Sequence, residues 1–164
     1  MSTAFYPCCA HDIEEPRALL RNYVDHIIFC DINERHSFVR NRPAGSASAR
    51  SPTAELIFGD AREVVHRLPE ITVLFYRRDS TGEGGSGVFV LGDSFLPLVL
   101  QRFSTHGGLI VTDGSNSRGG NFKKMIRTNG LMKHGWKFSK SSEQPFLERH
   151  QLHIIEVKPL SDGR

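Results

Sequence analysis

The sequence lacks any long run of apolar residues. Its most apolar windows, residues 71–76 and 108–112, are far shorter than the roughly 20 residues that a helix needs to cross a bilayer. Residues 1–12 also lack the basic stretch and the apolar stretch of a secretory signal. These absences predict a cytoplasmic protein without a membrane segment.

Cysteine is scarce, with three residues in the chain of 164. Cys8 and Cys9 are adjacent and Cys30 is the third, so they cannot form a framework of paired disulfides. We expect reduced thiols. The eight histidines include one close pair, His150 and His153, with no Cys-x-x-Cys beside it, so the sequence predicts no zinc site.

A strong excess of either charge is also missing. Lys and Arg number 21 against 18 Asp and Glu, which gives a net charge of +3. The hydrophobic content of 38% together with 15 glycines is typical of a globular protein. This composition excludes an acidic disordered chain and a uniformly basic nucleic-acid coat, and the length predicts one domain over residues 1–164.

Acidic residues are absent from residues 114–142, although this segment is rich in basic ones. The basic residues there are Arg118, Lys123, Lys124, Arg127, Lys133, Lys137 and Lys140. Phe122, Trp136 and Phe138 lie between them. Two interpretations stay open: a surface that contacts nucleic acid or an acidic protein, or a solvated helix face beside core aromatics.

The apolar pattern alternates between strand and helix. Strands are predicted at residues 3–7, 26–30, 55–58, 72–76, 108–112, 136–139 and 152–157, and helices at 14–24, 62–68, 91–103 and 121–128. Residues 35–53 and the glycine-rich residues 81–87 are predicted to be exposed, mobile loops. The order predicts an α/β fold: a doubly wound, mostly parallel seven-stranded sheet with helices on both faces and an antiparallel C-terminal β-hairpin.

An aspartate follows five of the expected strands. These aspartates are Asp12, Asp31, Asp60, Asp79 and Asp113. Ligands of such sheets bind at the carboxyl ends of the strands, so the aspartates indicate a binding edge. The alternative is that most of them cap helices or turns.

This order of elements resembles the class I S-adenosylmethionine-dependent methyltransferase fold over essentially the whole chain. The resemblance implies S-adenosylmethionine as cofactor. It implies that Asp31 binds the ribose hydroxyls and that Asp60, in the pattern Gly59-Asp60-Ala61, contacts adenine. A carboxylate suits both roles, because it accepts two hydrogen bonds from a diol or one from an exocyclic amine.

The first loop departs from that family, whose loop is rich in glycine. Here it reads Cys8-Cys9-Ala10-His11-Asp12, with no glycine. Cys8 and Ala10 are small residues in the same place, and the resemblance implies that they and Asp12 line the cofactor. A nucleophilic thiol is a second interpretation of Cys8 and Cys9, and packing of small residues is a third.

Asp79, which follows the fourth expected strand, is the candidate catalytic residue, as a base or a substrate anchor. The alternative is an ion pair with Arg77 or Arg78. Residues 76–80 lack the Asn/Asp-Pro-Pro-aromatic pattern with which many methyltransferases act on nucleic-acid amines. That particular geometry is therefore not predicted.

Three functions remain open from the sequence. The first is an S-adenosylmethionine-binding methyltransferase of unknown acceptor. The second is a non-enzymatic binding or regulatory protein of the same fold that contacts nucleic acid or an acidic partner through residues 118–140. The third is a metal-dependent hydrolase that uses the strand-end aspartates. The elements occupy nearly the whole chain, so specificity is expected from the loops, the basic segment or a second copy of the protein.

Overall fold

The computed structural model describes residues 1–33, 51–77, 94–114, 127, 129–141 and 144–160. The strands in these ranges are β1 (Thr3–Pro7), β2 (His26–Asp31), β3 (Thr53–Phe58), β4 (Val73–Tyr76), β5 (Gly108–Thr112), β6 (Leu131–Lys133), β7 (Trp136–Lys140) and β8 (His153–Pro159). The helices are α1 (Glu14–Leu20), α2 (Ala61–Val64), the 3₁₀ helix η2 (Val65–Arg67), α3 (Leu96–Leu100) and α5 (Pro145–Arg149).

All of these strands belong to one sheet in the order β3-β2-β1-β4-β5-β8-β7-β6. Strands β1 to β5 are parallel, and β8, β7 and β6 continue the sheet in antiparallel pairing. The predicted α/β class, with a mostly parallel sheet and antiparallel C-terminal strands, is confirmed. The strand order reverses between β1 and β4, where sheets of this type leave a crevice for ligands.

The predicted count of seven strands is wrong, because β6 is an eighth strand. It has three residues, too few to show an alternating pattern in the sequence. Leu131 alone packs on the core, opposite the buried Phe138 of β7. A two-residue turn joins β6 to β7, and His134 and Gly135 both have positive φ, as a tight hairpin turn requires.

The C-terminal hairpin therefore differs from the predicted one. Strands β7 and β8 do pair in antiparallel register, but α5 lies between them in the chain. This helix was missed because residues 141–149 are mostly polar. Its contact with the core is made by Leu147, which is fully buried, and by the partly buried Phe146.

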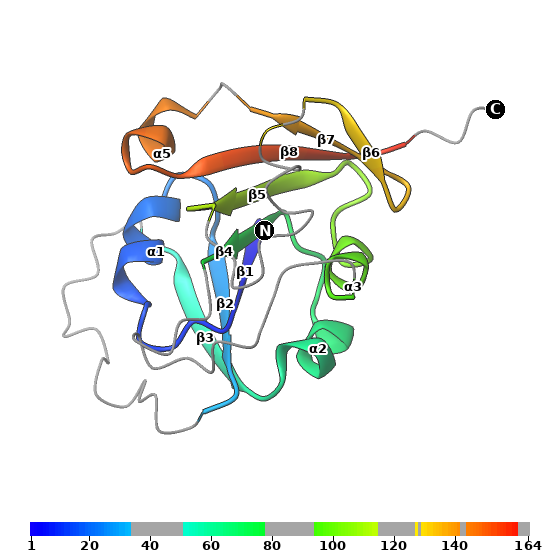
Figure 1. Cartoon of the computed structure of the whole chain (residues 1–164). Coiled ribbons are helices and arrows are strands. Elements are labelled where there is room, and N and C mark those ends of the chain that lie inside the picture. Colours follow the sequence, from blue (N-terminus) through cyan, green and yellow to red (C-terminus); the bar gives the residue numbers. More distant parts are fainter. Residues whose placement is uncertain (34–50, 78–93, 115–126, 128, 142–143, 161–164) are drawn as a thin grey trace.

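In β1, β2 and β4, successive residues belong to two different clusters of buried side chains. Phe29 and Phe75 belong to a buried cluster with Leu20 of α1 and with Leu147 of α5. Phe5 belongs to a second cluster with residues of α2 and α3. Figure 1 shows α1 and α5 on one side of the sheet and α2 and α3 on the other. Each fully buried large side chain contributes about 1.5–3 kcal/mol to this packing.

Helix α1 is shorter than the sequence pattern suggests. It ends at Leu20, so Tyr23 and Val24 lie beyond it, and Ala18 faces solvent. Pro97 lies in the first turn of α3, where a missing backbone donor is tolerated.

Several predicted segments fall outside the described residues. Residues 35–50 of the predicted loop 35–53 are among them, as are Asp79 and the glycine-rich residues 81–87. The predicted helix 121–128 is also among them, except for Arg127. In the described part of the chain, every helix is too short or too polar to cross a membrane.

Candidate functional site at the carboxyl ends of the strands

Asp31 is the last residue of β2 and is buried, with 6% of its surface exposed. Its Oδ2 accepts a hydrogen bond of 2.8 Å from the Ala10 backbone N–H, and its Oδ1 accepts one of 2.7 Å from that of Asn33. Asp31 thus organises the loops after β1 and β2 at the same edge of the sheet.

The loop after β1 adopts a backbone that normally requires glycine. Cys8 has φ 56° and Ala10 has φ 47°, in the left-handed region that costs a residue with a Cβ roughly 1–2 kcal/mol. The loop is held by a 3.0 Å bond from the Cys9 N–H to the Cys30 carbonyl. The small residues noted in the sequence therefore do take glycine-like conformations here.

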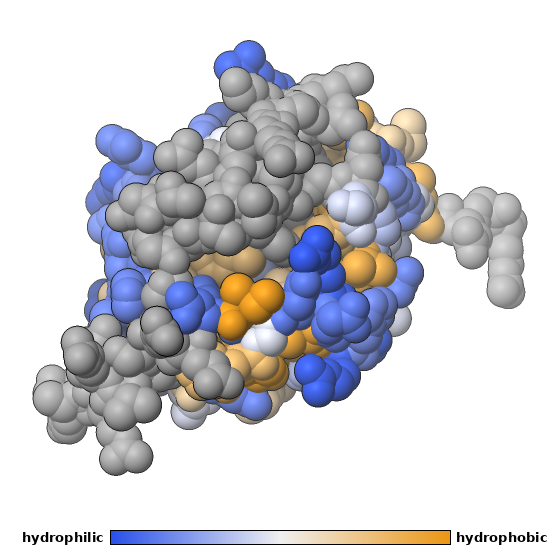
Figure 2. Space-filling view, turned by 60° about the horizontal axis from the view of Figure 1, so that its bottom comes forward, coloured by the Kyte–Doolittle hydropathy of each residue, from blue (hydrophilic) through white to orange (hydrophobic). Residues whose placement is uncertain are grey.

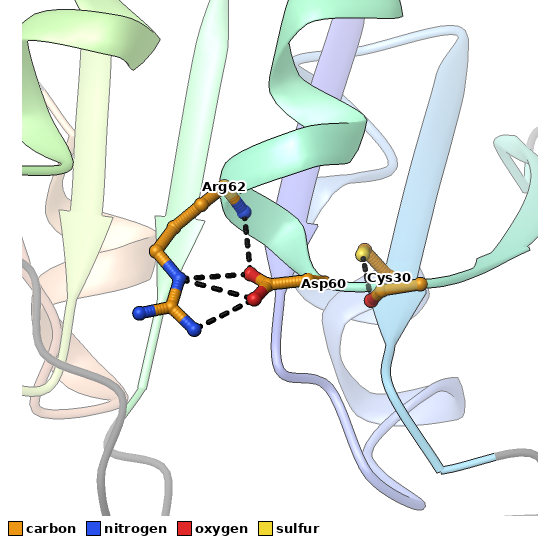
Figure 3. A network of polar contacts seen from close by, with 4 residues as sticks. Cys30, Asp60 and Arg62 are labelled. Atoms are coloured by element: carbon orange, nitrogen blue, oxygen red, sulfur yellow. Dashed lines mark hydrogen bonds and ion pairs between the residues drawn. The ribbon is translucent and has the colours of Figure 1, made fainter.

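Asp60 follows β3 and caps α2. Its Oδ1 accepts a 2.9 Å hydrogen bond from the Arg62 backbone N–H, and the Arg62 guanidinium folds back onto both carboxylate oxygens, as Figure 3 shows. The hydrogen bonds from Arg62 lower the pKa of the Asp60 carboxyl. Ala61, the first residue of α2, is buried in the core.

The turns that carry the two aspartates are neighbours. The Gly59 N–H donates a 2.9 Å bond to the backbone carbonyl of Asp31. The thiol of Cys30 donates to the Gly59 carbonyl at 3.4 Å. Asp31, Asp60 and the loop after β1 are therefore brought together, as the sequence suggested.

Asp12 takes part in a second polar cluster, at the end of β4. Its Oδ2 accepts hydrogen bonds from the Tyr6 hydroxyl at 2.8 Å and from the Arg77 guanidinium at 3.0 Å. Arg77 also donates to Glu15 at 2.8 Å, and its guanidinium carbon lies 5.2 Å from the centre of the Phe75 ring. Sequence reasoning missed Glu15 and Tyr6 and gave Arg77 a local partner instead.

The thiols of Cys9 and Cys30 pack in the core. Cys9 and Cys30 are buried. Burial raises the pKa of the Cys9 thiol, helped by the nearby Asp31 carboxylate, and raises the pKa of Cys30 to about 12. Thiolate, the nucleophilic form, is therefore scarce at neutral pH, and the nucleophile interpretation of Cys9 is not supported.

Two large apolar side chains are exposed next to these aspartates. Ile32 follows Asp31 and is 66% exposed, and Phe58 ends β3 and is 42% exposed. Figure 2, turned so that the lower end of Figure 1 comes forward, shows hydrophobic surface among hydrophilic residues at this end. An exposed apolar surface beside the buried Asp31 carboxylate and the partly exposed Asp60 suits a flat ligand with polar edges.

The described residues do not form a metal-binding site. No three His, Cys, Asp or Glu side chains among them are grouped to hold an ion. The hydrolase hypothesis required such a group among the strand-end aspartates. Of these, Asp31 and Asp60 bond to backbone N–H groups, and Asp79 lies outside the described residues.

Solved structures of methyltransferases share this arrangement of elements. An rRNA methylase from Streptococcus thermophilus matches 98% of the chain over 88% of its own length, with a TM-score of 0.53 and 12% identity. A Staphylococcus aureus protein assigned as a caffeoyl-CoA O-methyltransferase matches 96% over 76%, with a TM-score of 0.58 and 12% identity. The chain has the class I methyltransferase fold.

A third protein of this fold carries a ligand. It is a methyltransferase-type protein from Streptococcus mutans, in complex with S-adenosylhomocysteine, which matches 98% of the chain over 89% of its own length. Its TM-score is 0.55 and its identity is 10%. In sequence, the chain matches no family model and no curated protein. The likeness to these solved structures is therefore one of fold.

Proposed function

We propose that the protein binds S-adenosylmethionine at the carboxyl ends of β1, β2 and β3 and transfers its methyl group to an acceptor. The observation that carries this proposal is the position of Asp31, a buried carboxylate at the end of β2 that is bonded to the loop after β1. The class I fold of the chain, and the S-adenosylhomocysteine bound by a protein of that fold, support the choice of ligand.

The side chains at the carboxyl ends of β2 and β3 each have a proposed contact with the cofactor. The Asp31 carboxylate accepts hydrogen bonds from the ribose hydroxyls. The side chains of Ile32 and Phe58, both exposed, cover the faces of the adenine ring. Asp60 accepts a bond from the adenine amine, and the Arg62 side chain, 62% exposed, is free enough of the core to shift for it.

The remaining roles concern the reacting end of the cofactor. The backbone of Cys8 and Ala10 approaches the ligand closely, because both side chains are small and the loop is tightly turned. Asp12 lies beside the methionine moiety. When bound, the cofactor supplies an electrophilic methyl group, and the chain contributes alignment of the acceptor. Asp79 remains our proposal for the base or substrate anchor.

Calorimetric titration of the full chain with S-adenosylmethionine and S-adenosylhomocysteine tests this function. We expect Asp31→Ala to weaken binding at least ten-fold, since hydrogen bonds to a charged group contribute about 1.5–3 kcal/mol. Asp25→Ala is the matched control, because Asp25 lies at the opposite end of β2 and bonds to Ser2. Absence of binding at millimolar ligand, or equal binding by Asp31→Ala, would rule the proposal out.

The antiparallel end of the sheet supports a second candidate function, nucleic-acid binding. Met132, Lys137 and Lys158 lie directly opposite one another on β6, β7 and β8. Met132 is 68% exposed, and the side chain of Lys158 is 60% exposed although it pairs with Glu156 at 2.8 Å. This row would meet a phosphate backbone, and Arg127 is a further exposed basic residue of the predicted segment.

Only part of the predicted basic segment bears on this candidate. Arg127, Lys133, Lys137 and Lys140 are described, whereas Arg118, Lys123 and Lys124 are not. Binding to single-stranded RNA, followed by fluorescence anisotropy, should weaken steeply with salt. Lys137→Gln with Lys158→Gln should flatten that dependence, and Arg21→Gln, beyond α1, should not. A flat salt response in the unmodified protein would eliminate nucleic-acid binding.

A further inference from the structure

We propose that Arg77 is a positioning residue that holds the glycine-free loop of residues 8–12 in the shape that the cofactor requires. This inference rests on the proposed function for its link to the cofactor. Its structural half, the fixing of the loop, stands on the contacts of the chain alone. Arg77 itself need not touch the ligand.

The loop needs an external restraint because of its backbone. Cys8 and Ala10 both have positive φ, and a residue with a Cβ stays in this region only where its surroundings fix it. One side of the loop is fixed by β2. The Ala10 N–H donates to Asp31 at 2.8 Å and the Cys9 N–H to the Cys30 carbonyl at 3.0 Å.

Arg77 fixes the other side of the loop, where it enters α1. Its Nη1 donates to Asp12 at 3.0 Å and to Glu15 at 2.8 Å. Asp12 in turn is bonded back into the loop, because its N–H donates to the Cys9 carbonyl at 2.8 Å. A single guanidinium group thus ties the end of β4 to both the loop and the first turn of α1.

The guanidinium is itself held in place. It lies over the ring of Phe75, which is fully buried, and Tyr6 packs edge-on against the same ring at 4.9 Å between centroids. The Tyr6 hydroxyl shares Asp12 with Arg77. Removal of Arg77 would leave two carboxylates at the start of α1 without the cation between them, and the loop would lose its restraint from β4.

Two measurements on Arg77→Met test the inference. The first is amide hydrogen exchange without ligand, in which the N–H groups of Ala10 and Asp12 should exchange at least ten-fold faster than in the unmodified protein. The second is calorimetry with S-adenosylhomocysteine, in which the Kd should rise at least ten-fold. Arg102→Met is the control, because Arg102 bonds to the His66 carbonyl, away from the loop, and should change neither value by more than two-fold.

Rescue separates positioning from general destabilisation. Ala10→Gly in the Arg77→Met background should bring the Kd back to within about three-fold of the unmodified protein, since glycine adopts positive φ without strain. Arg77→Lys keeps the charge but replaces the planar guanidinium fork by a single ammonium nitrogen, so its Kd should fall between those of Arg77→Met and the unmodified protein. This variant also serves if Arg77→Met does not fold.

The outcomes distinguish the two proposals. If the unmodified protein binds S-adenosylhomocysteine and Arg77→Met binds it equally well, Arg77 is not a positioning residue. If the unmodified protein does not bind at all, the proposed function fails, and the exchange rates alone decide whether Arg77 fixes the loop. Unchanged exchange at Ala10 and Asp12 overturns the inference in either case.

Discussion

At the scale of single residues, the positive φ angles of Cys8 and Ala10 predict how a glycine at position 10 changes the free energy of unfolding. Ala10→Gly should leave the free energy of unfolding unchanged or raise it by up to about 1 kcal/mol, because the relief of strain offsets the greater chain entropy of glycine. The matched change Ala4→Gly, at a fully buried position of β1, should lower it by about 1 kcal/mol. Urea denaturation of both variants measures the difference.

A loss of stability in Ala10→Gly equal to that in Ala4→Gly would contradict the left-handed conformation of Ala10. The sequence could indicate that small residues occupy this loop. It could not indicate which of them take positive φ, because that depends on Asp31, 21 positions away.

The three thiols give a second prediction at this scale. At pH 8, a thiol reagent should modify at most one cysteine of the folded chain quickly, Cys8, which is half-buried. Cys9 and Cys30 should react slowly, because they are buried and their thiol pKa values are raised. All three should react at once in urea. Rapid reaction of two or more thiols in the folded protein would show that this part of the core is open.

At the scale of elements, the contact between α1 and β4 depends on pH. The hydrogen bond from Arg77 lowers the pKa of the Glu15 carboxyl from its ordinary value of 4.5. A lowered pKa in the folded state means that the ionised carboxylate stabilises the fold above pH 4.5 and that this stability is lost as the pH falls through the lowered pKa.

Ionisation of the Glu15 carboxyl falls between about pH 7 and about pH 3. Glu15→Gln should therefore reduce the loss of unfolding free energy over this pH range. The change should be at most about 1 kcal/mol, since the Glu15 side chain is 58% exposed. Glu14→Gln is the control, because Glu14 pairs with Arg17 and not with β4. Identical pH profiles for both variants would contradict a stabilising contact between Glu15 and Arg77.

The elements that sequence patterns predicted best are those with local causes. Strand β1 and strand β5 have the predicted bounds, because each is a short apolar run between polar or turn residues. Strand β6 and helix α5 were missed because few of their residues contact the core: Leu131 in β6, and Phe146 and Leu147 in α5. Such a contact exists only once the neighbouring strands are in place.

At the scale of the whole molecule, the alternation of strands and helices was enough to predict the α/β class. It also predicted that residues following the parallel strands share one edge of the sheet, which is how Asp31 and Asp60 could be chosen as candidates. The cluster of Tyr6, Asp12 and Arg77 could not be predicted. Asp12 and Arg77 are 65 positions apart, and their contact follows from the neighbouring positions of β1 and β4 in the sheet.

The two candidate binding surfaces lie on different parts of the sheet. Asp31, Asp60 and the exposed Ile32 lie at the carboxyl ends of the parallel strands β2 and β3. The row of Met132, Lys137 and Lys158 lies on the antiparallel strands at the other side of the sheet, with β1, β4 and β5 in between. Cofactor binding and contact with an anionic partner can therefore be tested independently.

The central claim is that the cofactor binds at the ends of β1 to β3, and titration of the ¹⁵N-labelled protein with S-adenosylhomocysteine, followed by NMR, tests it most directly. We predict that the largest shifts of amide resonances fall on Ala10, Ile32, Asn33 and Ala61. No shifts at millimolar ligand, or shifts confined to β6, β7 and β8, would contradict the claim.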